Sequence, residues 1–541
     1  NGADPYVWLE QREAPEVTTY LNAENAHTDA WLEPHKALEQ SLFEEIRGRI
    51  RETDLGLPSP KGNWLYYQRT EAGAEYPRFY RCERSVADSL EIHKPSEQLI
   101  LDLNSLASGE EFLQLGDFSI SPDQRWLAYS LDTQGDETYR LFLLSLDDMQ
   151  TQELSLDDAD GSLCWAQDNK TLFAVSMDET SRPSTLWRLQ PGTEPAQVFH
   201  DPDQRFYVSA YLSSSERYIC VSSNSKNTSE IHYLPADKPT AQLRCLASRE
   251  ADHEYDADHG SDGFMIRSNR LGEMFCLYSC DAGKPGLENW ELVTPPDPQR
   301  TLEEISLQST ALVLQYRHLG LTQLEVRVTG NNSYTLAMPD AVYSLSVQGG
   351  EEYSSPQIRL RYESLNRPAE VRALTLATGE QHVLKQTPVE GIFDPDDYLI
   401  ERLWAKAKDG THIPISLICH KDTQGEAPLY LYGYGSYGAS MDPWFSHARL
   451  SLLHRGWVFA IAHVRGGADM GEHWYQQGKL QHKENTFSDF IACAEHLIST
   501  NKTSPQHLVI AGGSAGGLLI GNVINQRPEL FAAAVADVPF V

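Results

Sequence analysis

The segment Gly-Gly-Ser-Ala-Gly-Gly at residues 512–517 constrains the fold of this chain more than any other feature. It follows an apolar run, 508–511, and precedes another, 518–525, and this order predicts a strand, a sharp turn and a helix. The pattern Gly-x-Ser-x-Gly in this context is typical of a nucleophile elbow, in which a serine lies on a strained turn and small neighbours let the strand and the helix pass closely. The residues that would form this elbow are Gly512, Gly513 and Gly516.

Ser514 is the predicted catalytic nucleophile. The turn would expose its hydroxyl at the positive end of the following helix. The backbone N–H of Ala515 could then donate to a developing oxyanion. The alternative is a glycine-rich phosphate loop, but no Lys-Ser or Lys-Thr follows and the G-x-G-x-x-G spacing is absent. The segment therefore favours acyl transfer through serine.

A serine nucleophile needs a general base. In α/β-hydrolases, the fold in which this elbow occurs, the order along the chain is Ser, then Asp or Glu, then His. The 27 residues after Ser514 contain Asp537 but no histidine. Asp537 is expected to end the next strand, too early for the triad acid. Histidines upstream of the serine would break the order of the fold: His420, His447, His454, His463, His473, His482 and His496. We therefore expect the triad Asp and His to lie beyond Val541, so that this catalytic domain is incomplete.

The sequence divides into three regions that differ in the pattern of their apolar residues. Residues 1–56 read as helical, because apolar residues recur at spacings of four to six between Glu and Arg. Residues 57–390 consist of short apolar or alternating runs separated by turn residues, which predicts an all-β region. In residues 391–541 strand-like and helical runs alternate, which predicts a mostly parallel sheet with helices, here an α/β-hydrolase.

The β-rich region repeats. In one unit, the runs 118–123, 126–129 and 140–144 predict three consecutive strands, and similar groups recur along the region. About seven such units follow one another, most of them about 40–50 residues apart, which is the period of four-stranded propeller blades. The repetition favours a β-propeller, and a large β-sandwich is the alternative.

Length and charge limit the function classes. A chain of 541 residues is too long for one hydrophobic core, so at least two domains are expected. The formal net charge of −33 argues against nucleic acid as a partner, since binding phosphates needs clustered Lys and Arg. The charge favours cationic ligands or serves solubility alone. The sequence has no apolar run of about 18 residues, so no membrane partner is expected.

The eight cysteines are spread along the chain, without the spacing of a zinc site. They are expected to be free thiols in a reducing cytosol, which predicts a cytoplasmic protein. The start, Asn1 to Asp4, is polar and shows no signal peptide. One polar cluster is interpreted as a loop between blades rather than as a metal site: His253, Asp256, Asp258 and His259. No metal and no organic cofactor is expected.

Several stretches resemble the oligopeptidase B branch of the prolyl oligopeptidase family of serine peptidases. They are 431–440, 463–467, 474–475, 483–487, 512–517 and 525–531, with further likeness upstream at 6–9, 252–255, 267–270 and 383–387. The resemblance spans nearly the whole chain and is densest in its last 120 residues or so. It implies a seven-bladed β-propeller, 57–390, that caps an α/β-hydrolase domain, 391–541, with the helical segment 1–56 on the hydrolase side.

The resemblance also implies a second oxyanion donor, the hydroxyl of Tyr434. This residue follows a predicted strand and lies between Gly433 and Gly435, where backbone can approach a ligand. From the residues alone, an ordinary aromatic in a tight turn is the alternative.

The same resemblance implies cleavage of short peptides after Arg or Lys. Ala515 and Gly435-Ser436-Tyr437 stand where prolyl oligopeptidases usually carry Asn and Gly-Gly-Phe, and both departures favour the B branch. The acidic residues of that specificity are expected beyond Val541. The alternatives are a prolyl oligopeptidase, an acylaminoacyl peptidase, or a propeller that only binds partners. The oligomeric state is not predicted.

Overall fold

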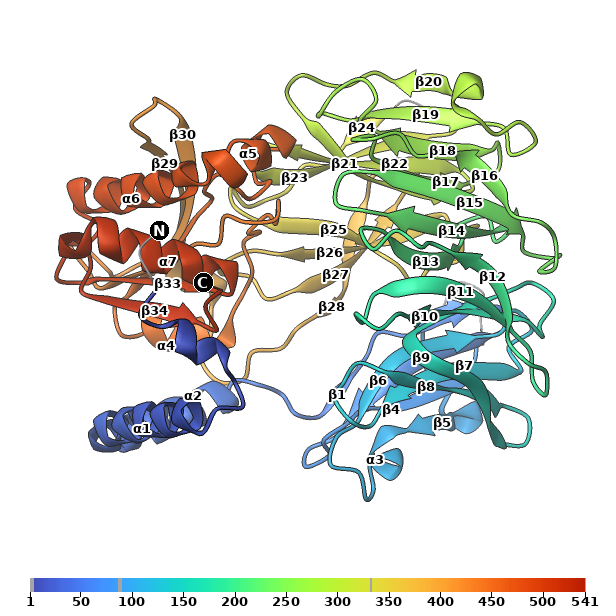
Figure 1. The fold of residues 1–541 in the computed structure, drawn as a ribbon, viewed down its shortest axis with the longest axis horizontal. Helices are drawn as coiled ribbons and strands as arrows, with labels where there is room; N and C mark the ends of the chain where they lie inside the picture. Colours follow the sequence, from blue (N-terminus) through green and yellow to red (C-terminus); the bar gives the residue numbers. More distant parts are fainter. Residues whose placement is uncertain (1–3, 86–89, 331–332, 541) are drawn as a thin grey trace.

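In the computed structural model, the chain forms two bodies (Figure 1). One contains the strands from β1 to β28, and the other contains the sheet that begins with β29. The structure describes residues 4–85, 90–330 and 333–540. Asn1 to Ala3 of the predicted polar start, and Val541, lie outside the described residues. None of the helices in the described part has the length and hydropathy of a transmembrane helix.

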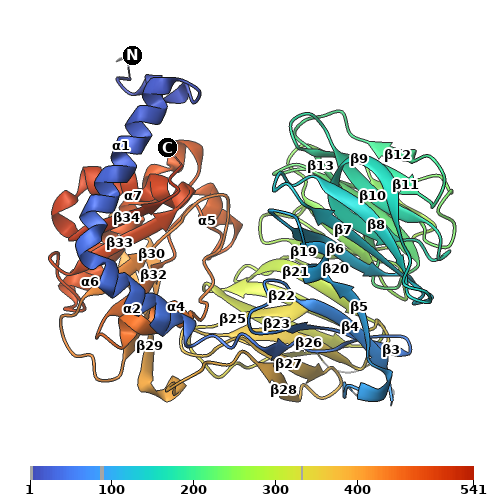
Figure 2. The ribbon, with the colours of Figure 1, turned by 90° about the horizontal axis from the view of Figure 1, so that it is seen from below.

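The N-terminal segment is helical, as predicted, with α1 (Pro15–Leu32) and α2 (Lys36–Arg47). Its apolar residues are less buried than their periodicity suggests, since Leu38 is 53% exposed. The end of the segment packs on α4 (His447–Leu453), where the Arg49 guanidinium donates to Ser451 Oγ at 2.6 Å. Figure 2 shows α1 crossing the front of the body that contains the sheet β29–β34.

The β-rich region forms six hydrogen-bonded sheets among the described residues. The first has five strands: β1 (Asp54–Leu55), β2 (Ser59–Lys61), β3 (Trp64–Thr70), β4 (Arg78–Glu83) and β5 (Gln98–Asp102). The short helix α3 (Leu103–Leu106) follows it. The second has seven strands: β6 (Gln114–Ile120), β7 (Trp126–Asp132), β8 (Tyr139–Ser145), β9 (Thr151–Trp165), β10 (Leu172–Met177), β11 (Pro183–Leu189) and β12 (Ala196–His200).

The other four sheets have four antiparallel strands each. They are β13 (Tyr207–Leu212), β14 (Tyr218–Asn224), β15 (Ser229–Pro235) and β16 (Arg244–Ala247); β17 (Tyr255–His259), β18 (Phe264–Ser268), β19 (Cys276–Cys280) and β20 (Glu291–Thr294); β21 (Thr301–Gln308), β22 (Ala311–His318), β23 (Leu321–Val328) and β24 (Tyr334–Thr335); and β25 (Ser344–Gln348), β26 (Gln357–Glu363), β27 (Glu370–Thr375) and β28 (Gln381–Gln386).

The structure corrects the expected count of seven separate blades. The seven-stranded sheet is continuous because β9 pairs with β8 near its start, where Thr151 faces Leu144, and with β10 at its end, where Trp165 faces Leu172. A strand of 15 residues is long enough to serve both neighbours. The three strands predicted from 118–144 are confirmed as β6, β7 and β8.

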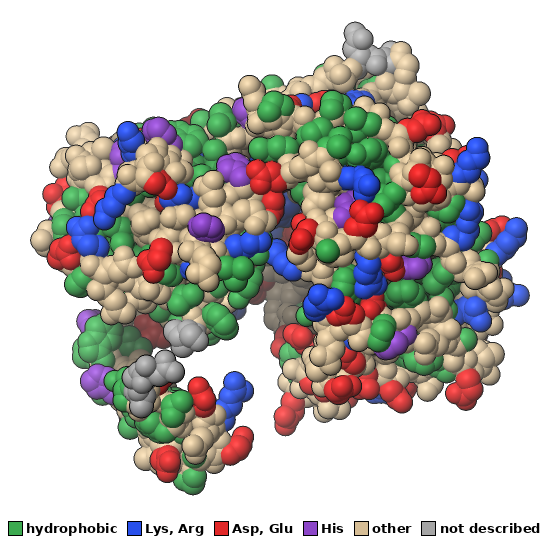
Figure 3. Space-filling model, turned by 45° about the horizontal axis from the view of Figure 1, so that its top comes forward, with side chains coloured by type: hydrophobic (Ala, Val, Ile, Leu, Met, Phe, Trp, Pro, Cys, Tyr) green, Lys and Arg blue, Asp and Glu red, His purple; other side chains and the backbone are tan. Residues whose placement is uncertain are grey.

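Strands of four of the sheets border a common cavity of about 440 Å³, which supports a propeller rather than a sandwich. Its lining includes Lys61 of β2, Phe118 of β6, Leu212 of β13 and Leu307 of β21. The last sheet meets the first, because Arg359 of β26 donates to the Pro58 carbonyl at 2.6 Å. On the face shown in Figure 3, Lys and Arg side chains are interspersed with Asp and Glu.

The C-terminal region contains a six-stranded sheet in the order β29-β30-β32-β31-β33-β34. The first two strands pair antiparallel, and the last four run parallel to one another. The strands are β29 (Tyr398–Lys406), β30 (His412–His420), β31 (Leu429–Tyr432), β32 (Val458–Ala462), β33 (Leu508–Gly513) and β34 (Ala533–Asp537).

Alternate residues of this sheet pack on opposite faces, as the two-residue period of a strand requires. Leu431, Ala460 and Ile510 pack with the residues of α6 and α7, whereas Phe459 and Ile461 pack with those of α4. The sheet is therefore the middle layer between helices, and this arrangement holds the C-terminal ends of its parallel strands in place. The remaining helices of the region are α5 (Glu472–Gln476), α6 (Glu484–Ser499) and α7 (Ala515–Gln526).

Candidate active site

Ser514 connects β33 to α7 with φ 51° and ψ −119°. A positive φ is uncommon for a residue with a Cβ, and such strain persists only where the surroundings impose it. The Ser514 N–H donates to the Asp537 carbonyl at 2.9 Å, and its own carbonyl accepts from Gly517 and Phe540, each at 2.8 Å. These bonds hold the turn while the serine remains exposed to solvent.

Two of the three elbow glycines are sterically required. A Cβ on Gly512 would lie 2.5 Å from the Gly516 carbonyl oxygen, and one on Gly516 would lie 2.9 Å from the Gly433 carbonyl oxygen. A Cβ on Gly513 would meet its nearest neighbour at 3.6 Å, an ordinary contact. The close approach of β33, α7 and the end of β31 therefore depends on Gly512 and Gly516.

Ala515 is the first residue of α7, and no side chain caps the N-terminus of this helix. The first N–H groups of a helix have no intrahelical partner, so they are available to an anion. The Ala515 N–H thus lies next to the exposed serine, with the positive end of the helix dipole behind it.

Tyr434 lies two residues after β31, the strand that pairs with β33. Its Cα and Cδ2 are 3.5 and 3.4 Å from the position of a Cβ on Gly516, so the ring lies against the first turn of α7. The structure therefore brings Tyr434, Ser514 and Ala515 together at the same end of neighbouring parallel strands. Their catalytic roles remain predictions.

Lys483, just before α6, supports the loop that carries Tyr434. Its Nζ donates to the Gly435 carbonyl at 2.6 Å and to Ser436 Oγ at 2.7 Å. Burial lowers the pKa of Lys483 to about 8. The sequence alone assigned no role to Lys483, because a lysine just before a predicted helix is usually a solvated cation. Its hydrogen bond to the Gly435 carbonyl is apparent only in the folded structure.

The loop after β32, which carries Arg465-Gly466-Gly467, packs against the same segment. Gly438 N–H donates to the Gly466 carbonyl at 3.0 Å. Arg465 is 3% exposed and forms a hydrogen-bonded ion pair with Asp489 of α6, Nη2 to Oδ1 at 2.6 Å. A buried charge needs such a partner, and the pair ties this loop to the helix behind the site.

The upstream histidines have other partners. His447 faces the Pro388 carbonyl, and His454 lies between Tyr398 and Arg49. His463 is hydrogen-bonded at both ring nitrogens, to Ser416 Oγ at 2.7 Å and to Asp469 Oδ1 at 2.9 Å. At least one ring nitrogen of each of these three histidines is therefore engaged by a group other than Ser514.

Ser416, His463 and Asp469 are hydrogen-bonded in the order of a catalytic triad, but they are not accessible to a substrate. The three residues are 0, 1 and 3% exposed. Burial, and next the Arg402 charge, lower the pKa of His463, which favours its neutral form. Asp469 Oδ1 also accepts from the Met441 N–H at 2.9 Å, so the set connects the loops after β31 and β32. It is a buried structural network.

The structure corrects the interpretation of residues 253–259 as a loop, because Tyr255–His259 form strand β17. Their side chains have separate partners. His253 Nε2 is 2.8 Å from Ser268 Oγ, Asp258 Oδ1 accepts from the Ser214 N–H at 2.8 Å, and His259 Nδ1 is 2.7 Å from Ser215 Oγ. Asp258 and His259 are successive residues of β17, so their side chains point to opposite faces of the strand.

Two family profiles match the chain. The profile described as the N-terminal β-propeller domain of prolyl oligopeptidase matches residues 2–387, and that of the prolyl oligopeptidase family matches residues 443–541.

Similar proteins cover the chain almost completely. Dipeptidyl aminopeptidase BI of Pseudoxanthomonas mexicana is 36% identical over 557 residues, and Protease 2 of Moraxella lacunata is 34% identical over 548 residues. Each alignment covers 99% of this chain, and respectively 77% and 78% of the relative. The structure of oligopeptidase B from Leishmania major superposes with a TM-score of 0.92 at 32% identity, over 99% of this chain and 78% of that one.

Proposed function

The chain belongs to the prolyl oligopeptidase family of serine peptidases, and from this premise we propose that Ser514 is the nucleophile of an oligopeptidase that cuts short peptides after Arg or Lys. The observation that carries the proposal is the exposed Ser514 held at φ 51° between β33 and α7. Such strain at an exposed serine serves catalysis rather than stability.

The proposed reaction is acyl transfer in two steps. Ser514 Oγ attacks the scissile carbonyl carbon, its proton passes to a base and then to the leaving amine, and an acyl-enzyme forms. Water then hydrolyses the ester and restores the serine. The Ala515 N–H and the Tyr434 hydroxyl donate to the oxyanion in both steps. We assign no residue of this sequence as the base.

Specificity for Arg or Lys rests on indirect support. A net charge of −33 attracts cationic peptides. Ala515 and the segment Gly435-Ser436-Tyr437 resemble the oligopeptidase B branch, and a solved oligopeptidase B superposes over nearly the whole chain. The preference for short peptides would follow if the propeller caps the site and excludes folded proteins.

We propose the domains 1–56, 57–390 and 391–541, with the first packing on the third. In this division the second domain holds the six hydrogen-bonded sheets of the β-rich region, and the third domain is an α/β-hydrolase. All eight cysteines are free, which supports a cytoplasmic location.

A second candidate is a dipeptidyl aminopeptidase, favoured by the name of the relative that is 36% identical. That activity removes two residues from a free N-terminus. Reporters with P1 Arg that carry either a blocked or a free N-terminus separate it from an oligopeptidase, and P1 Pro and P1 Ala reporters test the prolyl and acylaminoacyl alternatives.

The test uses enzyme expressed from its complete coding sequence, with its intact mass recorded. Ser514→Ala should abolish turnover and fluorophosphonate labelling. Tyr434→Phe should lower kcat about 10²–10³-fold with a small change in KM, since it removes one oxyanion donor. Tyr437→Phe is the control, because this tyrosine of the same loop is 58% exposed.

Labelling that persists in Ser514→Ala would overturn the assignment of the nucleophile. Equal kcat values for Tyr434→Phe and Tyr437→Phe would remove Tyr434 from the oxyanion site. Faster cleavage after Pro than after Arg would reject the basic specificity and leave the serine mechanism standing.

A further inference from the structure

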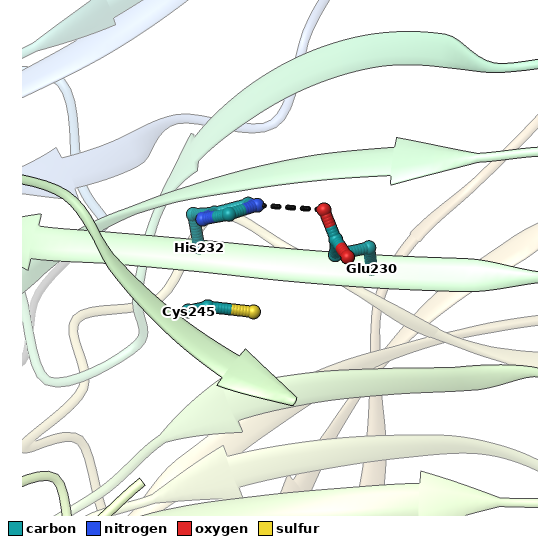
Figure 4. Close-up of side chains that lie close together, drawn as sticks. All are labelled: Glu230, His232 and Cys245. Carbon is teal, nitrogen blue, oxygen red and sulfur yellow. Dashed lines mark hydrogen bonds and ion pairs between the residues drawn. The ribbon is translucent and has the colours of Figure 1, made fainter. Parts of the chain in front are cut away.

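Three side chains with different metal-binding atoms meet on the outer strands of one propeller sheet. Glu230 and His232 are two residues apart on β15, so they share a face of the strand. Cys245 on β16 is the register partner of His232. One ligand atom from each of the three residues lies within 4.8 Å of the other two. Figure 4 shows the imidazole facing the carboxylate, with the Cys245 sulfur on the neighbouring strand.

The surroundings orient two of these ligands. Glu230 Oε1 lies 2.9 Å from His232 Nε2, while its Oε2 accepts from the Arg249 N–H at 2.9 Å. The His232 ring packs on Phe199 of β12, with ring centroids 4.9 Å apart. Such contacts around the ligands restrict their rotation, as they do in metal sites. All three side chains are partly exposed, so an ion and a water molecule can reach them.

The charges also suit a divalent cation. Glu230 and Asp201 both accept from the Arg249 guanidinium, Asp201 at 2.5 Å and Glu230 at 3.4 Å. Two carboxylates beside one guanidinium leave one net negative charge. A divalent ion that displaces the thiol proton of Cys245 would bring this group to neutrality. The guanidinium lies nearer to Asp201, so Glu230 keeps its capacity to bind a metal.

We propose that Glu230, His232 and Cys245 form a zinc-binding site completed by a water molecule. Carboxylate, imidazole and thiolate are all zinc ligands, and a mixed set with sulfur excludes magnesium and calcium. Tetrahedral zinc holds its ligand atoms roughly 3.3–3.7 Å apart, so an ion between Glu230 and His232 would replace their 2.9 Å hydrogen bond. The ion would bind β16 to β15 at the outer edge of the sheet.

The site departs from the expectation that the chain binds no metal. Residues 230, 232 and 245 have none of the short paired spacings by which zinc sites are found in sequences, and they meet only because β15 and β16 pair in this register. The proposal is independent of the peptidase reaction and of Ser514.

The test follows the reactivity of one thiol. Of the eight cysteines in this sequence, seven are buried and Cys245 is not, so N-ethylmaleimide should modify Cys245 before the other seven in the folded protein expressed from its complete coding sequence. Zinc chloride at ten times its Kd should slow this modification about elevenfold, because only the free fraction reacts. Cobalt(II) should give a thiolate-to-metal absorption band that is absent in Cys245→Ser.

His232→Gln and Glu230→Gln should keep the reactive thiol but lose most of the protection by zinc. His382→Gln, at an exposed histidine of β28, is the matched control and should retain it. Zinc should also raise the thermal unfolding midpoint of the wild type but not of Cys245→Ser. The proposal fails if zinc leaves the wild-type modification rate unchanged, or if protection is equal in His232→Gln and His382→Gln.

Discussion

Within the part of the chain that the structure describes, Lys483 Nζ donates to the Gly435 carbonyl and to Ser436 Oγ, in the loop that carries Tyr434, and to no carboxylate. Burial lowers the pKa of Lys483 to about 8, so the charge that strengthens these bonds is lost near that pH. A lysine far from the serine in the sequence thereby positions the proposed oxyanion donor.

We expect kcat of the wild-type enzyme to fall as the pH rises through about 8, because neutral Lys483 binds the Gly435 carbonyl more weakly. Lys483→Arg should extend the plateau to higher pH, since the guanidinium stays charged. Lys483→Met should lower kcat at every pH with a smaller change in KM.

Rates against pH between 7 and 9.5 with a P1 Arg reporter check this prediction, with Lys479→Arg as the control. If the profiles of the wild type and Lys483→Arg coincide, this lysine does not act through its charge.

At the scale of elements, the site depends on how closely α7 approaches the ends of β31 and β33. Gly512 and Gly516 allow that approach, and the backbone hydrogen bonds of Ser514 with Asp537, Gly517 and Phe540 hold the turn between strand and helix. The local pattern predicted this strand, turn and helix, because the elbow needs small residues at fixed offsets from the serine.

Gly516→Ala should destabilise the protein by about 1–3 kcal/mol, since its Cβ would lie 2.9 Å from the Gly433 carbonyl oxygen. It should also lower kcat by displacing Tyr434. Gly521→Ala in the same helix is the matched control. A Cβ there meets no atom within 4 Å, so it should stabilise α7 by about 0.5–1 kcal/mol.

Urea unfolding midpoints and kcat of the two variants check the prediction. Equal midpoints would mean that α7 can move away from β31 without cost, and that the elbow tolerates a larger residue.

At the scale of the whole molecule, the propeller closes where its last sheet meets its first. Arg359 of β26 donates to the Pro58 carbonyl at 2.6 Å, to Ser59 Oγ at 3.2 Å, and to Glu351 at 2.5 Å. Arg359 is 3% exposed, so its charge relies on these partners.

Arg359→Ala should destabilise the protein by about 3–5 kcal/mol, because it leaves Glu351 without its cation and opens the contact between the two sheets. Arg361 on the same strand is half exposed, and its partner Glu363 also accepts from the Phe445 N–H, so Arg361→Ala should cost less than about 1 kcal/mol. Tryptophan fluorescence during urea unfolding measures both. Similar losses would show that the ring is closed by other contacts.

Features that depend on local chemistry could be predicted from the sequence. The strand, turn and helix around Ser514, the strands of the β-rich repeat and the helices before it all follow from periodicity and turn residues, which act over a few positions. The sharing of β9 between neighbouring strands could not be predicted that way, because it depends on which strands pair.

Tertiary structure alone decided the remaining relationships. It placed Tyr434 against α7, Lys483 behind the Tyr434 loop, Arg359 beside Pro58, and Cys245 opposite His232. These partners lie from 13 to about 300 residues apart in the chain, so no local spacing encodes them. Their meeting is set by sheet order, strand register and the burial of apolar faces, which are properties of the folded chain as a whole.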